Sequence, residues 1–215
     1  MLYGEIREAL LIRNDDSSLV VDRLCDQARG QNTAVTCFYF DFAARKEQSA
    51  ANMLGSLVKQ MVSGMERIPD EISTAFQEQK RFIGGCGPQL TDLVKMLQLI
   101  TSSQPTFMCI DALDECVGVQ RVKVLDSLKQ ILGRSSGTRI FVTGRPHIRA
   151  EMEKSFAGRM GNLSVCTTKG DITEYLRVRL GEDVMPDAMS ASLEAEILER
   201  IPENISEMCA WKLCL

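Results

Sequence analysis

Short runs of β-branched and aromatic residues, separated by longer segments of helical periodicity, constrain the fold of this chain most. The runs are TAVTCFYFDF at 33–42, PTFMCID at 105–111, TRIFVT at 138–143 and a weaker LSVCT at 163–167. The first run is apolar on both faces, which is typical of a strand buried in a parallel sheet. Strands that alternate with helices predict an α/β fold, in which helices flank a parallel sheet.

Composition and charge narrow the class of protein. Of 215 residues, 45% are hydrophobic and 25% are charged, which are ordinary values for a globular chain with one sizeable domain. The net charge is −4 and no block of five basic residues occurs, so nucleic acid and anionic membranes are not expected as partners. No signal peptide and no apolar run long enough for a membrane span is visible. We therefore expect a soluble, cytoplasmic protein.

The cysteines do not indicate a metal site. The chain has eight cysteines without a C-x-x-C pair, and its one histidine is His147. A zinc site needs clustered ligands of these two types. Several cysteines, such as Cys37 and Cys109, lie in apolar runs, which is typical of buried or free thiols in a reducing cytosol. His147 has no evident partner for catalysis, and we interpret it as a helix-start residue.

The strongest chemical signal is the segment FMCIDALDE at 107–115. Its apolar residues predict a core strand that delivers Asp111 at the carboxyl edge of the sheet, where open α/β sheets bind ligands. A carboxylate there suits Mg²⁺, and Asp114 and Glu115 could orient or deprotonate an attacking water. The alternative is a buried strand followed by an acidic helix start. Three acids in the pattern D-x-x-D-E favour the functional interpretation, a Walker B motif.

A second signal is the segment IFVTGRP at 140–146. A β-rich strand ends in a polar residue, and the cation Arg145 follows at its tip. Such a cation can sense or neutralise a γ-phosphate. The alternative is a surface arginine in a turn before a proline. By itself the motif is weak, but its place one helix after the Walker B segment matches a sensor-type strand.

These motifs carry a resemblance to a known family. FYFDF, a Leu-rich helix, FMCIDALDEC and RIFVTGRPHI follow one another in order, and together they resemble the NACHT-type NTPase region of fungal NOD-like proteins. That region is also described as a nephrocystin 3-like N-terminal domain, and the resemblance covers residues 17–208. It implies a P-loop NTPase-like fold with the start of an all-helical lid region.

The resemblance also implies a function for the family and roles for four residues. Such proteins are STAND-class switches, in which nucleotide exchange and oligomerisation relay a signal from C-terminal repeats (ankyrin, WD40 or TPR) to an N-terminal effector. Asp111 would be the Mg²⁺ position, Asp114 and Glu115 the catalytic pair around the water, and Arg145 the nucleotide sensor. The implied cofactors are Mg²⁺ and ATP or GTP.

One part of the family pattern is missing. The family has a strand and G-x-x-x-x-G-K-S/T directly before the helix that begins here at Ser17. This chain has IRNDD at 12–16, and the one glycine upstream is Gly4. Without glycines the loop cannot turn its N–H groups onto phosphates, and an arginine is a poor substitute for the lysine. The two aspartates would repel phosphate. We expect a chain truncated before this helix and deficient in nucleotide binding.

The resemblance divides the chain into three segments. Residues 1–16 would be a divergent N-terminus in place of the P-loop strand and Walker A, 17–181 a partial NACHT core, and 182–215 the truncated start of a helical region. We expect no further element after the helix that Pro202 interrupts. In related ATPases the P-loop strand lies beside the sensor strand, and Ala9-Leu10-Leu11-Ile12 is a candidate for that place.

Three hypotheses on function remain at this stage. The chain is a partial signalling NTPase domain without turnover, an interaction or regulatory module that pairs with itself or with intact NACHT relatives, or a working ATPase or GTPase with an atypical phosphate site. The missing glycines argue against the third hypothesis. The sequence does not separate the first two, and it contains neither an effector nor a repeat domain.

Overall fold

The computed structural model describes residues 16–80, 87–166, 168–182, 190–205 and 209–214. These residues fall into two compact units, one within Met1–Leu163 and Trp211–Leu215 and the other within Ser164–Ala210. The larger unit holds the parallel part of the sheet and the residues to which the sequence assigns chemistry.

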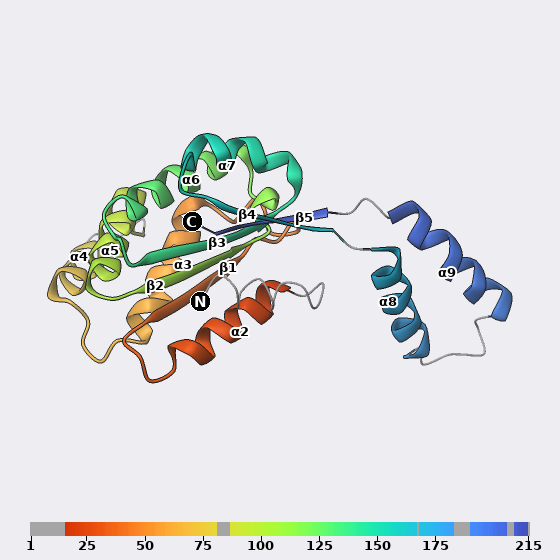
Figure 1. Cartoon of the computed structure of the whole chain (residues 1–215). Coiled ribbons are helices and arrows are strands. Elements are labelled where there is room, and N and C mark those ends of the chain that lie inside the picture. Colours follow the sequence, from red (N-terminus) through yellow and green to blue (C-terminus); the bar gives the residue numbers. More distant parts are fainter. Residues whose placement is uncertain (1–15, 81–86, 167, 183–189, 206–208, 215) are drawn as a thin grey trace. The chain divides into compact units, whose positions relative to one another are not determined.

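Three parallel strands form the centre of the larger unit (Figure 1). They are β1 (Ala34–Tyr39), β2 (Thr106–Asp111) and β3 (Thr138–Gly144), which lie side by side in this order. Tyr39 pairs with Asp111 in the register of β1 and β2, so these strands end together at one edge of the sheet. The predicted parallel α/β sheet is confirmed.

Helices cover the two faces of this sheet unequally (Figure 1). The side chains of Met108, Ile110, Ile140 and Val142 alternate with those of Cys109 and Phe141, so the two sets lie on opposite faces. The first set belongs to the large core cluster, which also includes buried residues of α3 (Ala50–Ser63), α4 (Asp70–Lys80), α5 (Leu90–Ser103), α6 (Gly118–Leu132) and α7 (Arg149–Phe156). The second set packs on Val20 and Leu24 of α2 (Asp16–Ala28).

The helices form where the sequence has apolar residues at helical spacing. In α3 the residues Met53, Leu54, Leu57 and Met61 fall on one stripe, and all four are buried. Burying one side chain of this size contributes about 1.5–3 kcal/mol before the entropy cost. Ser49 caps the start of α3 by accepting a hydrogen bond from the N–H of Asn52.

Two further strands extend the sheet. They are β4 (Gly161–Cys166) and β5 (Cys209–Cys214), and the full order is β1-β2-β3-β5-β4. β5 pairs with β3 in the antiparallel direction, with Val142 opposite Leu213. The expectation of no further element near the C-terminus is therefore wrong. The physical reason is that β3 offers a row of backbone donors and acceptors, which a short segment can satisfy without a strong strand pattern of its own.

The position beside β3 bears on the missing P-loop strand. The candidate for that position, Ala9-Leu10-Leu11-Ile12, lies outside the described residues. In the part of the chain that the structure describes, the neighbour of β3 on the side away from β2 is the antiparallel strand β5.

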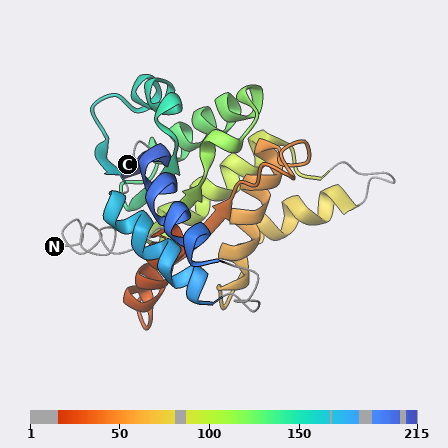
Figure 2. The same cartoon turned by 90° about the vertical axis from the view of Figure 1, so that its right-hand side faces the viewer.

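The smaller unit contains the helices α8 (Lys169–Gly181) and α9 (Ala191–Ile205), which lie side by side (Figure 2). Thr168 and Asp171 form a reciprocal capping box at the start of α8. Pro202 does not end α9, which continues to Ile205. A proline inside a helix removes one backbone hydrogen bond and crowds the carbonyl four residues before it, which favours a kink rather than an end at this position. None of the described helices is long and apolar enough to cross a membrane.

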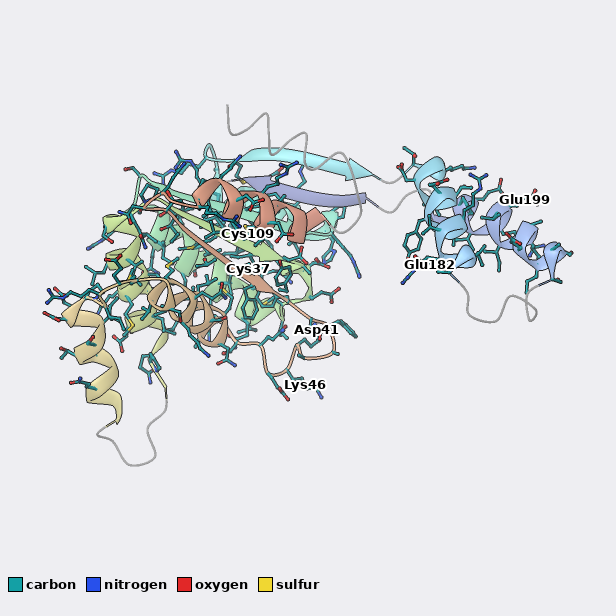
Figure 3. All side chains as sticks on the ribbon, turned by 90° about the horizontal axis from the view of Figure 1, so that it is seen from below. Cys37, Asp41, Lys46, Cys109, Glu182 and Glu199 are labelled. Carbon is teal, nitrogen blue, oxygen red and sulfur yellow. The ribbon has the colours of Figure 1, made fainter. Side chains whose placement is uncertain are left out.

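Four described cysteines, Cys25, Cys37, Cys109 and Cys116, form no disulfide. Cys37 and Cys109 are paired in the register of β1 and β2 (Figure 3). Cys25 lies in α2, and burial is the main reason that the pKa of its thiol is raised. These four residues are thiols rather than disulfides, in agreement with the prediction. In the described residues no group of three histidine, cysteine or acidic side chains is placed to hold a metal ion.

Candidate functional site

The candidate site begins where β2 ends. After Asp111 the chain turns sharply into a short 3-10 helix, η1 (Leu113–Glu115). The turn is made by Ala112, whose φ of 51° lies in the left-handed region and costs a non-glycine residue about 1–2 kcal/mol. The buried side chain of Leu113 anchors the turn in the core. The turn thereby places two further carboxylates beside the end of the neighbouring strand, β3.

Thr143 holds the turn and Asp111 together. Its hydroxyl donates to Oδ1 of Asp111 at 2.5 Å and accepts from the N–H of Ala112 at 2.9 Å. Thr143 is buried near the end of β3, so one carboxylate oxygen of Asp111 is fixed by a side chain of the next strand. From the sequence, Thr143 is expected only as a polar residue at a strand end, without a contact. Its signal was a hydroxyl at the end of an otherwise apolar run.

The acidic pair and the predicted sensor residue are in contact. Arg145 Nε lies 3.5 Å from Asp114 Oδ2, and Arg145 Nη2 lies 3.2 Å from Glu115 Oε1. The backbone N–H of Arg145 also donates to Asp114 Oδ1 at 3.2 Å. The side chains of Asp114 and Glu115 are 5% and 17% exposed, whereas that of Arg145 is 70% exposed. A cation that can still reach solvent therefore covers two largely buried carboxylates.

Gly144 makes this close approach possible. A Cβ at this position would lie 2.8 Å from Cδ1 of Ile148 and 3.3 Å from Oδ1 of Asp114. Ile148 belongs to η2 (Pro146–Ile148) and is fully packed in the core. The requirement for glycine is thus one of space, first for Cδ1 of Ile148 and then for the Asp114 carboxylate.

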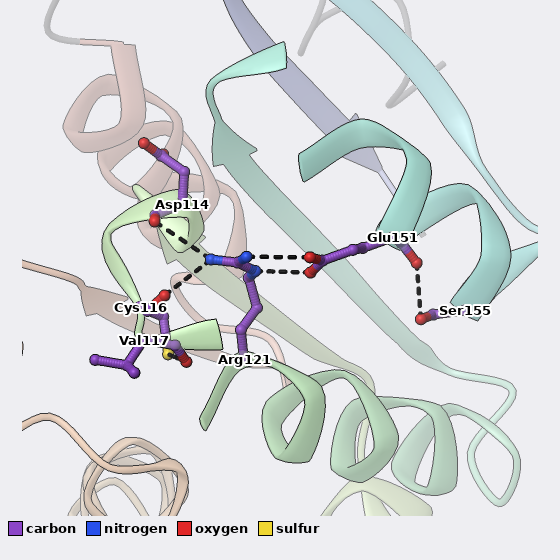
Figure 4. Close-up of polar contacts among 6 residues, drawn as sticks. All are labelled: Asp114, Cys116, Val117, Arg121, Glu151 and Ser155. Carbon is purple, nitrogen blue, oxygen red and sulfur yellow. Dashed lines mark hydrogen bonds and ion pairs between the residues drawn. The ribbon is translucent and has the colours of Figure 1, made fainter. Parts of the chain in front are cut away.

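A second arginine, Arg121, contacts the backbone of the turn at Asp114 and Cys116 (Figure 4). Arg121 of α6 binds Glu151 of α7 through two parallel hydrogen bonds, Nε to Oε2 at 2.7 Å and Nη2 to Oε1 at 3.1 Å. The hydrogen bond from Arg121 lowers the pKa of Glu151, and burial opposes this effect. Neither residue was predicted from the sequence, because 30 positions separate them and neither lies in a motif.

The structure brings together all four residues that the sequence singled out. Asp111, Asp114, Glu115 and Arg145 lie at the carboxyl ends of β2 and β3 and in the turns that follow them. Their roles in chemistry stay predictions. His147 lies in η2 at a helix start, as predicted, and its charge contributes to lowering the pKa of Glu151.

The arrangement fits a magnesium ion only in part. Mg²⁺ takes oxygen ligands, and proteins commonly supply one or two carboxylates while water and substrate phosphates supply the rest. Asp111 offers one such carboxylate, oriented by Thr143. Since the described residues contain no group of three potential ligands, the ion would depend on phosphate oxygens. The site suits a metal that arrives with a nucleotide better than a permanently bound metal.

Comparison with known proteins gives one family. The model of the family described as "Nephrocystin 3, N-terminal" matches residues 17–145, which is more than half of the chain. The match begins in α2 and ends at Arg145, so it includes the complete acidic turn. Neither curated proteins nor solved structures provide a match.

Proposed function

The chain belongs to the nephrocystin 3 N-terminal family, and on this basis we propose that it is a partial NACHT-type signalling NTPase domain of the STAND class. In this proposal it keeps the Walker B and sensor positions and does not bind a nucleotide tightly. Its ancestral ligands would be Mg²⁺ with ATP or GTP, and its place of action the cytoplasm.

One observation carries the proposal. The acidic turn after β2 and the cation after β3 meet at one edge of the sheet, with Asp114 and Glu115 both within ion-pair distance of Arg145. Parallel α/β sheets bind ligands at this edge. A mere acidic helix start would not need the left-handed Ala112, nor a neighbouring hydroxyl that orients Asp111.

Each group has a chemical task in this proposal. Asp111 would hold Mg²⁺ through a carboxylate oxygen, and the ion would neutralise charge on the phosphates. Glu115 and Asp114 would orient or deprotonate a water. Arg145 is exposed enough to exchange its ion pairs with the two carboxylates for contacts with a γ-phosphate. Whether Arg145 contacts the two carboxylates or the nucleotide would then depend on whether the γ-phosphate is present.

The expected weakness of nucleotide binding follows from charge. P-loop proteins hold the β- and γ-phosphates with backbone N–H groups and a lysine. The segment IRNDD at 12–16 supplies neither glycines nor that lysine. The three carboxylates of the site would face a triphosphate with like charge, and Arg145 alone offsets only part of it.

Calorimetry on the whole chain tests the proposal. Mg-ATP and Mg-GTP are expected to bind with dissociation constants above about 1 mM, which leaves less than about 4 kcal/mol of binding free energy. A dissociation constant in the low micromolar range would refute it and favour a working ATPase or GTPase with an atypical phosphate site. In that case Asp111→Ala should weaken the binding.

A graft tests whether the acidic half still works. Residues 1–16 are replaced by a strand and G-x-x-x-x-G-K-T-x-x joined to Ser17, which supplies the missing donors and lysine. Mg-nucleotide binding should appear in the graft, and Asp111→Ala should weaken it there. A graft that is folded by circular dichroism and still fails to bind would show that Asp111, Asp114, Glu115 and Arg145 do not form half of a nucleotide site.

The second candidate function is an interaction or regulatory module. The segment 164–210 carries more than twice as many acidic as basic residues. Tyr175, Val178 and Leu193 of α8 and α9 are exposed apolar side chains on this acidic unit. Such a surface suits a protein partner, either a second copy or an intact NACHT relative. Light scattering and a pull-down against an intact relative test this, with Val178→Asp as the variant that should lose binding.

A further inference from the structure

The guanidinium of Arg121 faces two parts of the molecule at once (Figure 4). Nε and Nη2 bind the carboxylate of Glu151, and Nη1 donates to the backbone carbonyls of Cys116 at 2.8 Å and Asp114 at 3.4 Å. Its side chain is only 12% exposed, so little solvent competes for these contacts. The planar fork of arginine suits such a set of contacts, and the point charge of lysine does not.

The two carbonyls lie on either side of Glu115, in the turn that carries the acidic pair. Arg121 therefore binds the backbone of this turn, while the side chains of Asp114 and Glu115 contact Arg145. Its partner Glu151 lies in α7, the helix that follows Arg145 and η2. Arg121 thus connects the segment that carries the acids to the segment that carries the cation.

The turn has few other backbone contacts that would hold it. The N–H groups of Glu115 and Cys116 donate to Ala112 and Leu113 at 2.9 and 3.2 Å, and these bonds lie within the turn itself. They fix its local shape and do not fix where it lies relative to β3. In the described residues, the polar contacts that reach across to β3 and to Arg145 include the Ala112–Thr143 hydrogen bond and the bonds between Arg145 and the acidic pair. The link through Arg121 adds an independent constraint at the far end of the turn.

We propose that Arg121 is a positioning residue of the candidate site, which holds the Asp114–Glu115 turn so that both carboxylates stay against Arg145. This inference rests on the proposed function for the meaning of the site, but the geometry it concerns can be measured without any nucleotide. The competing explanation is that Arg121 and Glu151 merely tie α6 to α7.

The amide proton of Arg145 reports the position of the turn, because this N–H donates to Asp114 Oδ1. Its exchange rate is measured by NMR in the whole chain and compared with amides inside β3, which report overall stability. Asp114→Ala, which removes the acceptor, sets the rate of the unprotected amide. Arg121→Met keeps the aliphatic bulk and removes all donors. Glu151→Gln is the matched control, since it weakens the tie to α7 and leaves the donors to the turn in place.

In Arg121→Met the Arg145 amide is expected to exchange about tenfold faster relative to β3, the factor expected for loss of a hydrogen bond to a charged group. In Glu151→Gln it should stay within about twofold of the wild-type rate. Should Arg121→Met fail to fold, Arg121→Gln replaces it, with a smaller acceleration expected because one amide donor remains.

Two results would overturn the inference. An Arg145 amide that accelerates only in proportion to the β3 amides would show that Arg121 contributes stability alone. Equal acceleration in Arg121→Met and Glu151→Gln would show that the tie between α6 and α7, and not the contact with the turn, sets the geometry. Neither result depends on nucleotide binding, so failure of this inference and failure of the proposed function are separable.

Discussion

Replacing Gly144 with alanine tests how tightly the candidate site is packed. The added Cβ would lie 2.8 Å from Cδ1 of Ile148, closer than real Cβ atoms approach a carbon, and 3.3 Å from Oδ1 of Asp114. The backbone of Gly144 has no positive φ, so the substitution causes no conformational strain of its own. Any destabilisation in Gly144→Ala therefore measures the lack of space.

The size of the destabilisation in Gly144→Ala depends on whether the side chain of Ile148 can move away from the new methyl group. Ile148 is 1% exposed and belongs to the main core cluster, so its side chain cannot swing into solvent. Forcing an extra methyl group into such a site costs typically about 1–3 kcal/mol. Ile148→Val removes the Cδ1 atom that meets the new methyl group, and by itself it should cost about 0.5–1.5 kcal/mol.

Urea unfolding of the two single variants and the double variant measures the coupling. In the double variant the methyl group added by Gly144→Ala occupies part of the volume that the missing Cδ1 leaves, so the cost should be at least about 1 kcal/mol less than the sum of the two. Additivity to within about 0.5 kcal/mol would refute the clash with Ile148 as the cause. The double variant would then point to the contact with the Asp114 carboxylate as the source of the cost.

Substitutions at three further positions test other contacts of the larger unit. Thr143→Val leaves the N–H of Ala112 without its acceptor and should lower the free energy of unfolding by about 1–3 kcal/mol. Thr143→Ser keeps the hydroxyl and should lower this free energy less. Urea unfolding measures both losses, and equal losses would contradict the role of the hydroxyl. Glu151 has a lowered pKa in the folded chain, so its contribution to stability is present above its ordinary value of 4.5 and is lost as the pH falls through the folded pKa. The stability difference between wild type and Glu151→Gln should accordingly be largest near neutral pH and shrink below about pH 4.5, and a difference that is constant with pH would exclude this linkage. Gln60 accepts from the N–H of Cys37 at 2.9 Å and donates to its carbonyl at 2.8 Å, so it covers the open edge of β1. Gln60→Ala should cost about 1–2 kcal/mol and increase self-association in light scattering, and an unchanged monomer of unchanged stability would argue against edge protection.

The central part of the fold was predictable from the sequence because its signals are local. The runs at 33–42, 105–111 and 138–143 contain β1, β2 and β3, and parallel pairing follows from the helices between them. β5 was not predictable in the same way. Its pairing with β3 depends on an open strand edge that is formed by residues far away in the sequence.

The same difference between local and long-range signals applies to the residues of the candidate site. Asp111, Asp114, Glu115 and Arg145 follow strand ends directly, and residues at the ends of neighbouring parallel strands must meet. The contacts that orient them belong to side chains without a motif. The hydrogen bonds from Arg121 to Glu151 form because α6 and α7 pack together, and this packing is a property of the whole core.

The pairing of β5 with β3 determines which segment of the chain can be replaced without loss of the sheet. The larger unit takes up the chain again at Trp211, so the smaller unit is an insertion whose two ends are both held by β4 and β5. The entropy cost of closing a loop grows only with the logarithm of its length. Halving the inserted segment would therefore change this cost by about 0.6 kcal/mol. Evolution or an engineer can therefore exchange α8 and α9 for a segment of quite different length and keep the five-stranded order, provided that the replacement returns the chain to the open edge of β3.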